Sequence, residues 1–409
     1  MRQRYTNVAS LKRDLNDVKP DAFVTVPLVL GTLYARVMAG LAAAGRIRAM
    51  LAKFLLAAGA THVRAMRVIN GVDIRFALAP PNVFAAALAR VVAAITAPLH
   101  RLAEKLVYPK VREGLAIKSA IVSGGGSLPT HLDDFYESIG LEVSNGWGLT
   151  ETSPVIAARR LDGDSDGDGD GDDAGLRSNV RGSVGVPIPG TEVRVVDPDT
   201  REDLADGCKG LLLVRGPGVM YGYLDDTAST AKVIDENGWF DTGDLGWVAP
   251  AGVEGSNMAG NVVLVGRMKD TIVLSSGENV EPVPLEDHVS QSPLVRQVMI
   301  VGNGERGLGA LVVPDVEAVE EFLGGFITSG YESPLKVVTK AVAKEVAQRL
   351  ASREGCRPEE IIPVSRIVVL PPEQVWDIDS GCLTRTFKLR RDEIAKRHAR
   401  EIDQIFNRG

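Results

Sequence analysis

The chain has 409 residues, of which 45% are hydrophobic and 24% are charged, close to the average usage of folded soluble proteins. This length allows two or three domains with sizeable cores, and the composition excludes a collagen-like, coiled-coil or wholly disordered protein. Three cysteines, none of them in a Cys-x-x-Cys pair, give little support for a disulfide framework or a cysteine-based zinc site.

Charge is unevenly distributed along the chain. Residues 1–120 hold 18 lysines and arginines against 6 acidic residues, a net charge of +12, whereas residues 121–409 carry a net charge of −19. The basic segment could contact an acidic protein or anionic lipid. It lacks interleaved aromatic residues, and the acidic remainder would repel phosphate, so nucleic-acid binding is not predicted.

The basic segment is predicted to be largely helical. A short helix precedes the strand pattern AFVTVPL, which ends at Pro27. In the alanine-rich region that follows, four basic residues fall within an arc of about 60° on a helix. This arrangement predicts a solvated basic face or a contact for acidic lipid or protein. The four residues are Arg46, Lys53, Arg64 and Arg67.

The most apolar stretch of the chain, residues 83–99, is interrupted by Arg90. It falls short of the ~20 residues that a membrane-spanning helix requires. The first residues have no apolar stretch behind their basic residues and few serines, so neither a secretory signal nor a transit peptide is predicted. We therefore expect no transmembrane helix.

From Ile121 the sequence changes to short β-rich runs punctuated by glycine, which predict a sheet-rich body. Residues 162–175 form an acidic low-complexity segment that we expect to be a disordered loop. The Asp-x-Asp spacing in this segment resembles an EF-hand loop, but Asp173 stands where a bidentate glutamate belongs, so specific calcium binding is not predicted.

The sequence after GRMKD predicts a separate small α/β domain. Two strand patterns, VRQVMIVGN and LGALVVPD, precede an amphipathic helix over residues 334–352. A basic loop and a terminal helix complete the chain.

Five polar motifs occur in order, and each is of a type that can hold part of a nucleotide. SGGGSLP lets the backbone lie close against a flat ligand. NGWGLTE places the Trp147 ring between glycines and offers the Thr150 hydroxyl for phosphate and the Glu151 carboxylate for Mg²⁺. Taken alone, this motif would be read as a core tryptophan followed by a helix start.

The other three motifs add charged groups. In GWFDTGDLG, Asp244 can accept hydrogen bonds from both ribose hydroxyls, and Asp241 is the competing turn residue. In GRMKD, Arg267 can pair with phosphate or ribose. In TRTFKLRR, Lys388 is a flexible point charge.

In this order, the motifs resemble the adenylate-forming superfamily of acyl-CoA synthetases, firefly luciferase and nonribosomal peptide adenylation domains. They are most similar to the long-chain fatty-acid group, in particular to plant and algal plastid acyl-activating enzymes. The resemblance implies an α/β adenylate-forming fold. In this chain the fold would comprise an incomplete, sheet-rich large domain over residues 1–268 and a small mobile C-terminal α/β domain over residues 269–409. It also implies a plastid location, with possible membrane association.

The resemblance implies that ATP activates a long-chain fatty acid as acyl-AMP, and that the pantetheine thiol of acyl carrier protein or CoA then displaces AMP. Lys388, Thr150 and Glu151 would be catalytic, and Lys269 would be the hinge of the small domain. The resemblance implies that Gly125, Gly126 and Trp147 hold adenine, Thr150 the α-phosphate, Glu151 Mg²⁺, Asp244 the ribose, and Arg267 the ribose or phosphate. Lys388 would stabilise the charge at the attacked phosphate.

Three departures qualify the resemblance. The family usually has tyrosine where Trp147 stands, and proline where Arg385 stands, which would loosen the loop that presents Lys388. The Ser/Thr/Gly-rich phosphate loop ending in Pro-Lys-Gly is not found, so we expect the chain to begin partway through the large domain. The alternative function is a catalytically inactive AMP-binding or membrane-surface remnant.

Overall fold

The computed structural model describes residues 6, 10–43, 45–160, 179–253, 256–316, 318–319, 334–353, 355–385 and 387–407. The chain divides into two compact units, Met1–Leu264 and Val265–Gly409, and each is described by itself. The acidic segment predicted over residues 162–175 lies outside the described residues.

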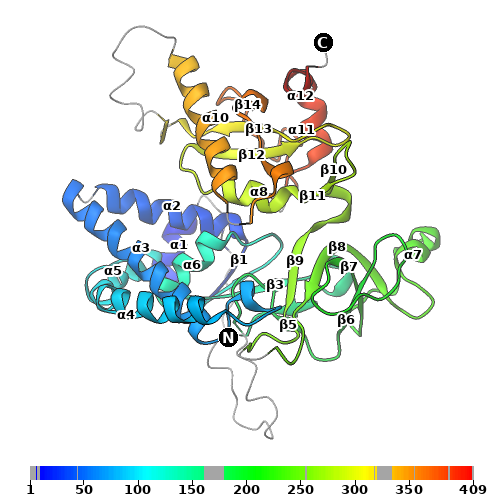
Figure 1. Ribbon diagram of the computed structural model, residues 1–409, viewed down its shortest axis with the longest axis horizontal. Coiled ribbons are helices and arrows are strands. Elements are labelled where there is room, and N and C mark those ends of the chain that lie inside the picture. The colour runs from blue at the N-terminus through cyan, green and yellow to red at the C-terminus, as the bar shows by residue number, and fades with distance from the viewer. Residues whose placement is uncertain are drawn as a thin grey trace, which may run out of the picture. The chain divides into compact units, whose positions relative to one another are not determined.

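A five-stranded sheet organises the first unit, with strand order β1-β2-β3-β4-β5 (Figure 1). Strands β1, β2 and β3 are parallel, whereas β4 and β5 are antiparallel to their neighbours. Because carboxyl ends of parallel strands meet at one edge of a sheet, the motifs that follow β2 and β3 leave the sheet side by side. The strands are β1 (Ala22–Thr25), β2 (Ala120–Ser123), β3 (Glu142–Trp147), β4 (Ala157–Ala158) and β5 (Val186–Pro187).

Helices account for most of the basic segment, as predicted. They pack around buried residues such as Leu30, Leu55, Tyr108 and Ile121. The helices of the first unit are α1 (Leu11–Val18), α2 (Pro27–Ala43), α3 (Arg46–Ile69), η1 (Ile74–Phe76), α4 (Val83–Leu106), α5 (Tyr108–Leu115), α6 (Thr130–Ser138), η2 (Thr150–Thr152) and α7 (Thr227–Val233).

Helix α4 is longer than the apolar stretch that marked it in the sequence. The side chain of Asn82 caps its start by accepting a hydrogen bond from the Ala85 amide at 2.8 Å. Its 24 residues run through Pro98 to Leu106, so the helix is long and apolar enough to cross a membrane by length and composition alone. The apolar stretch over residues 83–99 is therefore part of a longer helix, and the expectation of no transmembrane helix stays a prediction. Only 17% of its most apolar stretch is buried.

A second sheet in antiparallel order β6-β7-β8, extended by β9, shares its core with β3. Trp147, Ile156, Val214 and Phe240 belong to one buried cluster. This shared core brings the end of β3 close to β8. The strands are β6 (Glu192–Val196), β7 (Gly210–Arg215), β8 (Phe240–Val248) and β9 (Val262–Arg267).

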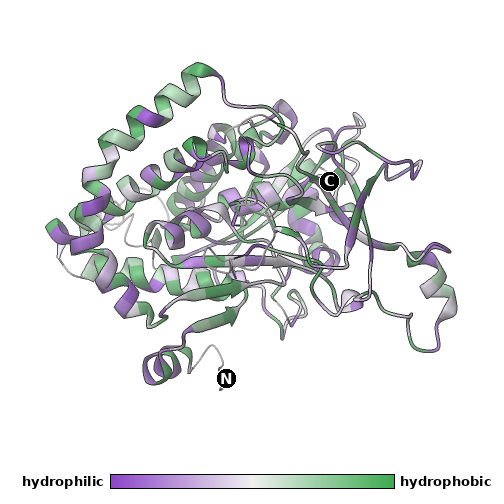
Figure 2. Cartoon of the chain, turned by 90° about the horizontal axis from the view of Figure 1, so that it is seen from below, coloured by the Kyte–Doolittle hydropathy of each residue, from purple (hydrophilic) through white to green (hydrophobic). Residues whose placement is uncertain are grey.

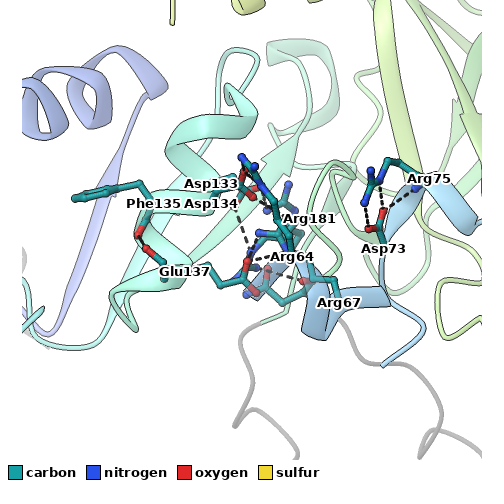
Figure 3. A network of polar contacts seen from close by, with 12 residues as sticks. Arg64, Arg67, Asp73, Arg75, Asp133, Asp134, Phe135, Glu137 and Arg181 are labelled. Carbon is teal, nitrogen blue, oxygen red and sulfur yellow. Dashed lines mark hydrogen bonds and ion pairs between the residues drawn. The ribbon is translucent and has the colours of Figure 1, made fainter. Parts of the chain in front are cut away.

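Ion pairs join α3 to α6 and correct one prediction (Figure 3). The Arg67 side chain is only 11% exposed and binds Asp134 at 2.7 Å as well as Glu137. Arg64, which is 54% exposed, also binds Asp134. The prediction that both arginines lie on a solvated basic face was wrong, because acids 70 residues further along the chain pair with them.

The same helix α6 anchors another part of the chain. Arg159 lies 2.7 Å from the Asp133 carboxylate, and Arg181 lies 3.4 Å from its other oxygen. All three side chains are almost completely buried. One carboxylate therefore holds together two segments that are separated by residues 161–178.

The second unit is a small α/β body in which β12 and β13 are antiparallel and β13 and β14 are parallel. The two predicted strands and the helix over residues 334–352 are confirmed. The single predicted terminal helix is wrong, because the chain bends at His398 and forms two helices. The elements are β10 (Ile272–Val273), β11 (Asn279–Val280), β12 (Val295–Val301), β13 (Gly309–Pro314), β14 (Ile367–Val369), α8 (Pro282–Val289), α10 (Pro334–Ser352), α11 (Arg391–Arg397), α12 (Ala399–Phe406), η4 (Met268–Asp270), η6 (Pro358–Glu360) and η7 (Val364–Arg366).

Candidate functional site

The glycine run leaves the carboxyl end of β2 beside β3. The Gly124 amide donates to the Thr25 carbonyl at 3.3 Å, and a Cβ on Gly124 would lie 3.6 Å from the Gly146 carbonyl oxygen. Gly125 has a φ of +79°, which favours glycine, and both Gly125 and Gly126 are exposed. The loop therefore presents exposed backbone next to the NGWG motif.

Two buried polar atoms lie where this loop begins. Ser123 and Asn145 are register partners on β2 and β3, and they are 0% and 5% exposed. Ser123 Oγ and Asn145 Oδ1 have no hydrogen-bond partner within the part of the chain that the structure describes. A buried polar atom without a partner costs about 1–3 kcal/mol, so a ligand with hydrogen-bond donors would suit this position. The sequence analysis missed both residues, although each stands at the start of a glycine motif.

The indole of Trp147 is hydrogen-bonded to Asp244. Its Nε1–H donates to Asp244 Oδ2 at 2.8 Å across 97 residues of sequence, and the two residues are 5% and 7% exposed. Asp241 takes the turn role, because it accepts from the Gly243 amide at 2.9 Å and pairs with Arg201. Trp147 is thus a core residue, as expected when its motif is taken alone. It is also the hydrogen-bond partner of Asp244, the residue predicted to bind ribose.

Glycine is required sterically at position 148. A Cβ there would lie 1.6 Å from the Pro154 carbonyl oxygen. The chain folds back at this point through η2 and Ser153, whose φ is +60°. This tight reversal places Thr150, which is exposed, and Glu151, which is half-buried, directly after the end of β3.

The loop between β7 and α7 holds the Glu151 carboxylate. The Tyr223 hydroxyl donates to Glu151 Oε1 at 3.0 Å, and the Met220 amide donates to the Glu151 carbonyl at 2.8 Å. Partial burial and the hydrogen bond to Glu151 raise the pKa of Tyr223 above its ordinary value, so the phenol stays a donor at neutral pH. The sequence analysis missed Tyr223, because no motif marks it.

Glu151 fits the predicted Mg²⁺ role. Within the described residues there is no group of three or more His, Cys, Asp or Glu side chains that could form an all-protein metal cage. Mg²⁺ is commonly held by one or two carboxylates together with substrate phosphates and water. A single anchored carboxylate matches this type of site.

The three remaining predicted residues belong to the second unit. Arg267 ends β9, and Lys269 is exposed in η4. Lys388 is exposed in a tight hairpin, in which the Lys388 amide donates to Thr384 Oγ1 at 3.0 Å and the Thr384 amide donates to the Lys388 carbonyl at 2.9 Å. The roles of these residues stay predictions.

Known proteins similar to this chain include three curated relatives. The chain is 40% identical to "Probable acyl-activating enzyme 16, chloroplastic" of Arabidopsis thaliana, over 99% of the chain and 54% of the relative. It is 38% identical to an Arabidopsis chloroplastic long-chain-fatty-acid–[acyl-carrier-protein] ligase, over 99% of the chain and 52% of the relative. It is 31% identical to a long-chain-fatty-acid–CoA ligase of Mycobacterium bovis, over 76% of the chain and 46% of the relative. The chain spans about half the length of these relatives.

Solved structures show the fold. The adenylation domain of a carboxylate reductase from Mycobacterium chelonae superposes with a TM-score of 0.63 at 19% identity, covering 98% of this chain and 48% of that one. The predicted α/β adenylate-forming fold is therefore confirmed. The family model "AMP-binding enzyme" matches residues 2–224, and "AMP-binding enzyme C-terminal domain" matches residues 269–409. Five motifs, the fold and both matches agree, and the chain belongs to the AMP-binding enzyme family.

Proposed function

We propose that this chain is part of an ATP-dependent ligase that activates a long-chain fatty acid and forms a thioester. Relatives that are named ligases of long-chain fatty acids with acyl carrier protein or CoA support the substrate class. The observation that carries the proposal is the hydrogen bond that joins Trp147, at the end of β3, to Asp244 of β8, beside the strand β2 that leads into the exposed glycine loop. Glu151, which is anchored by Tyr223, follows β3 closely.

Each residue of the first unit has a role that follows from its position. The exposed backbone of Gly125 and Gly126 takes the adenine together with Trp147, and the unpaired acceptor Asn145 Oδ1 suits its amino group. Asp244 accepts from the ribose hydroxyls and Thr150 donates to the α-phosphate. Glu151 holds Mg²⁺, which neutralises phosphate charge when it is bound.

The reaction has two displacements. A carboxylate oxygen of the fatty acid bonds to the α-phosphorus, and the bond to pyrophosphate breaks. The sulfur of a pantetheine thiolate then bonds to the acyl carbonyl carbon, and AMP leaves with the oxygen. In the proposal, Lys388 and Arg267 stabilise the charge that develops on phosphate, and Lys269 is the hinge of the small domain.

The thiol acceptor is acyl carrier protein or CoA. The +12 charge of residues 1–120 attracts an acidic carrier protein, and it suits the phosphates of CoA equally well. Following the two chloroplastic relatives, the proposed location is the plastid. Thioester formation measured with each acceptor separately identifies the one used, and equal inactivity with both would remove this choice of acceptors.

Two measurements test the site and the reaction. Calorimetric AMP binding should weaken by about tenfold or more in Asp244→Ala, given the usual strength of hydrogen bonds to a charged group. The matched control Asp241→Asn keeps the turn acceptor and should bind AMP normally. Fatty-acid-dependent pyrophosphate exchange then separates the ligase from an inactive AMP-binding remnant, which would bind AMP without exchange. We expect weak exchange for the chain alone and strong exchange when the other half of an Arabidopsis relative is supplied.

A second candidate function, contact with an anionic membrane surface, is favoured by one observation. Helix α4 has a buried face of small residues and a separate face of exposed apolar residues at helical spacing. Figure 2 colours the chain by hydropathy and shows helices with long hydrophobic stretches in green. Phe84 is 76% exposed and Ile95 is 65% exposed. Arg90, Arg101 and Lys105 flank this stripe, as in helices that lie in a lipid interface. The exposed stripe comprises Phe84, Leu88, Val91, Ile95, Leu102 and Leu106.

Vesicle co-sedimentation tests this contact. Binding to phosphatidylglycerol vesicles should exceed binding to phosphatidylcholine vesicles, and both Ile95→Glu and Lys105→Glu should reduce it. Lys232→Glu makes the same charge change on the exposed surface of α7 and should not reduce it. Equal binding by all variants would remove this candidate.

A further inference from the structure

We propose that Trp147 is a positioning residue for Asp244, and that its indole N–H gives the site its preference for ribose over 2′-deoxyribose. This inference rests on the proposed nucleotide-binding function, and it adds a role that the ring alone does not supply.

Both main chains that carry this pair are fixed by hydrogen bonds. The Trp147 carbonyl accepts from the Ile156 amide at 2.8 Å, at the end of the β3–β4 pairing. The Asp244 amide donates to Thr242 Oγ1 at 3.1 Å, and that hydroxyl donates to the Leu212 carbonyl at 2.7 Å. Because hydrogen bonds hold both backbones, the indole bond helps to fix the plane of the Asp244 carboxylate.

The chemistry of the pair explains the proposed preference. A carboxylate only accepts hydrogen bonds, and its two oxygens offer about four lone-pair sites. The bond at 2.8 Å from a buried N–H directs Oδ2 and uses one of these sites. A carboxylate fixed in this way can require a 2′-hydroxyl donor at one position, whereas a rotating carboxylate adapts to its loss.

The identity of the residue matters for this role. Phenylalanine has no donor, and the tyrosine that the family usually has carries its donor at the tip of the ring instead of its edge. The second carboxylate of the site is held similarly, because the Tyr223 hydroxyl binds Glu151 at 3.0 Å. Each of the two carboxylates therefore has an aromatic hydrogen-bond donor from a distant segment.

Calorimetric binding of AMP and of 2′-deoxy-AMP tests the inference. The wild-type chain should bind AMP more tightly, and Trp147→Phe, which keeps a flat ring, should reduce that ratio by roughly tenfold. In an Asp244→Ala background, Trp147→Phe should leave the ratio unchanged, because the group through which it acts is gone. Trp239→Phe, a tryptophan that packs against Arg194 and Arg215, is the control and should keep the wild-type ratio.

The outcomes are distinguishable. Equal weakening of both nucleotides in Trp147→Phe would assign the effect to ring packing and overturn the inference. If the wild-type chain binds no AMP, the proposed function itself fails. Should Trp147→Phe not fold, indole N–H exchange measured by NMR on ¹⁵N-labelled wild-type protein replaces it. The Trp147 proton should be protected, and exchange as fast as in Asp244→Ala would show that the bond is absent.

Discussion

Single positions in the NGWGLTE motif are constrained by the protein's own fold before any ligand binds. Gly148 shows this most clearly, because the carbonyl oxygen of Pro154 occupies the place of its missing Cβ. The second glycine of the motif is therefore explained by a close approach of backbone to backbone. A glycine in a binding motif can thus be required for packing instead of contact with substrate.

Gly148→Ala should destabilise the first unit by about 2–4 kcal/mol, because backbone atoms must move to admit the methyl group. Urea unfolding followed by circular dichroism measures the loss. Gly40→Ala is the matched control, since a Cβ at this exposed position of α2 meets nothing within 4 Å. The control should be neutral or gain up to ~1 kcal/mol. Similar losses in both variants would contradict the steric explanation.

Motifs in the sequence identify some residues of the candidate site, and the others could not be identified for a physical reason. Trp147, Glu151 and Asp244 stand in motifs whose residue types indicate nucleotide chemistry. Tyr223 bonds Glu151 from 72 residues away, and nothing near it in sequence shows this. Long-range hydrogen bonds depend on how sheets pack, which local patterns do not encode.

Among the elements, the α3–α6 contact depends on one buried arginine and one exposed arginine. Arg67→Ala should cost about 3 kcal/mol, because it leaves Asp134 and Glu137 short of a partner in a poorly solvated site. Arg64→Ala should cost about 1 kcal/mol or less, since Arg64 is 54% exposed. Chemical denaturation of the two variants gives both values. Equal costs would show that burial does not govern this ion network.

The junction of α11 and α12 makes stability depend on pH. Trp376 Nε1 donates to His398 Nε2 at 3.1 Å, so this nitrogen accepts only while the ring is neutral. Burial lowers the pKa of His398 below its ordinary 6.5. The unfolded chain then binds the proton more readily, so this contribution is complete above pH 6.5 and is lost as the pH falls toward the lowered pKa.

Thermal unfolding between about pH 5 and 8 measures this dependence. His398→Gln keeps an acceptor for the Trp376 N–H and cannot titrate, so its stability should fall less than that of the wild type on acidification. Parallel curves for the two proteins would show that the pKa of His398 is the same in the folded and unfolded states.

Element positions followed from hydrophobic pattern wherever an element packs on its neighbours in sequence. Strands β12 and β13 and helix α10 lie where alternation and helical periodicity placed them. The solvated basic face of α3 was wrong for Arg64 and Arg67, because their partners on α6 follow 70 residues later. The single terminal helix was wrong because the helix is interrupted at His398, whose ring accepts a hydrogen bond from the distant Trp376. Periodicity predicts which face is apolar, but not which distant charge covers a polar one.

At the level of the whole molecule, the proposed roles divide between the two units. Trp147, Thr150, Glu151 and Asp244, which are proposed to bind the nucleotide, belong to the first unit, and Lys388 belongs to the second. Lys388→Ala should therefore leave calorimetric AMP binding unchanged while slowing adenylation by about 10²-fold, the usual loss for a charge-stabilising group. Pyrophosphate exchange, with the other half of an Arabidopsis relative supplied, measures the rate. Unchanged exchange would show that Lys388 is not the stabilising residue.

Asp133 has a consequence for how this chain tolerates change. Arg159 and Arg181, which are 22 residues apart in sequence, meet on its one carboxylate. A substitution at Asp133 therefore acts on both segments at once, whereas a substitution at Arg159 or Arg181 removes one of its two ion pairs. The position behaves as a single rivet for two stretches of chain that are distant in sequence.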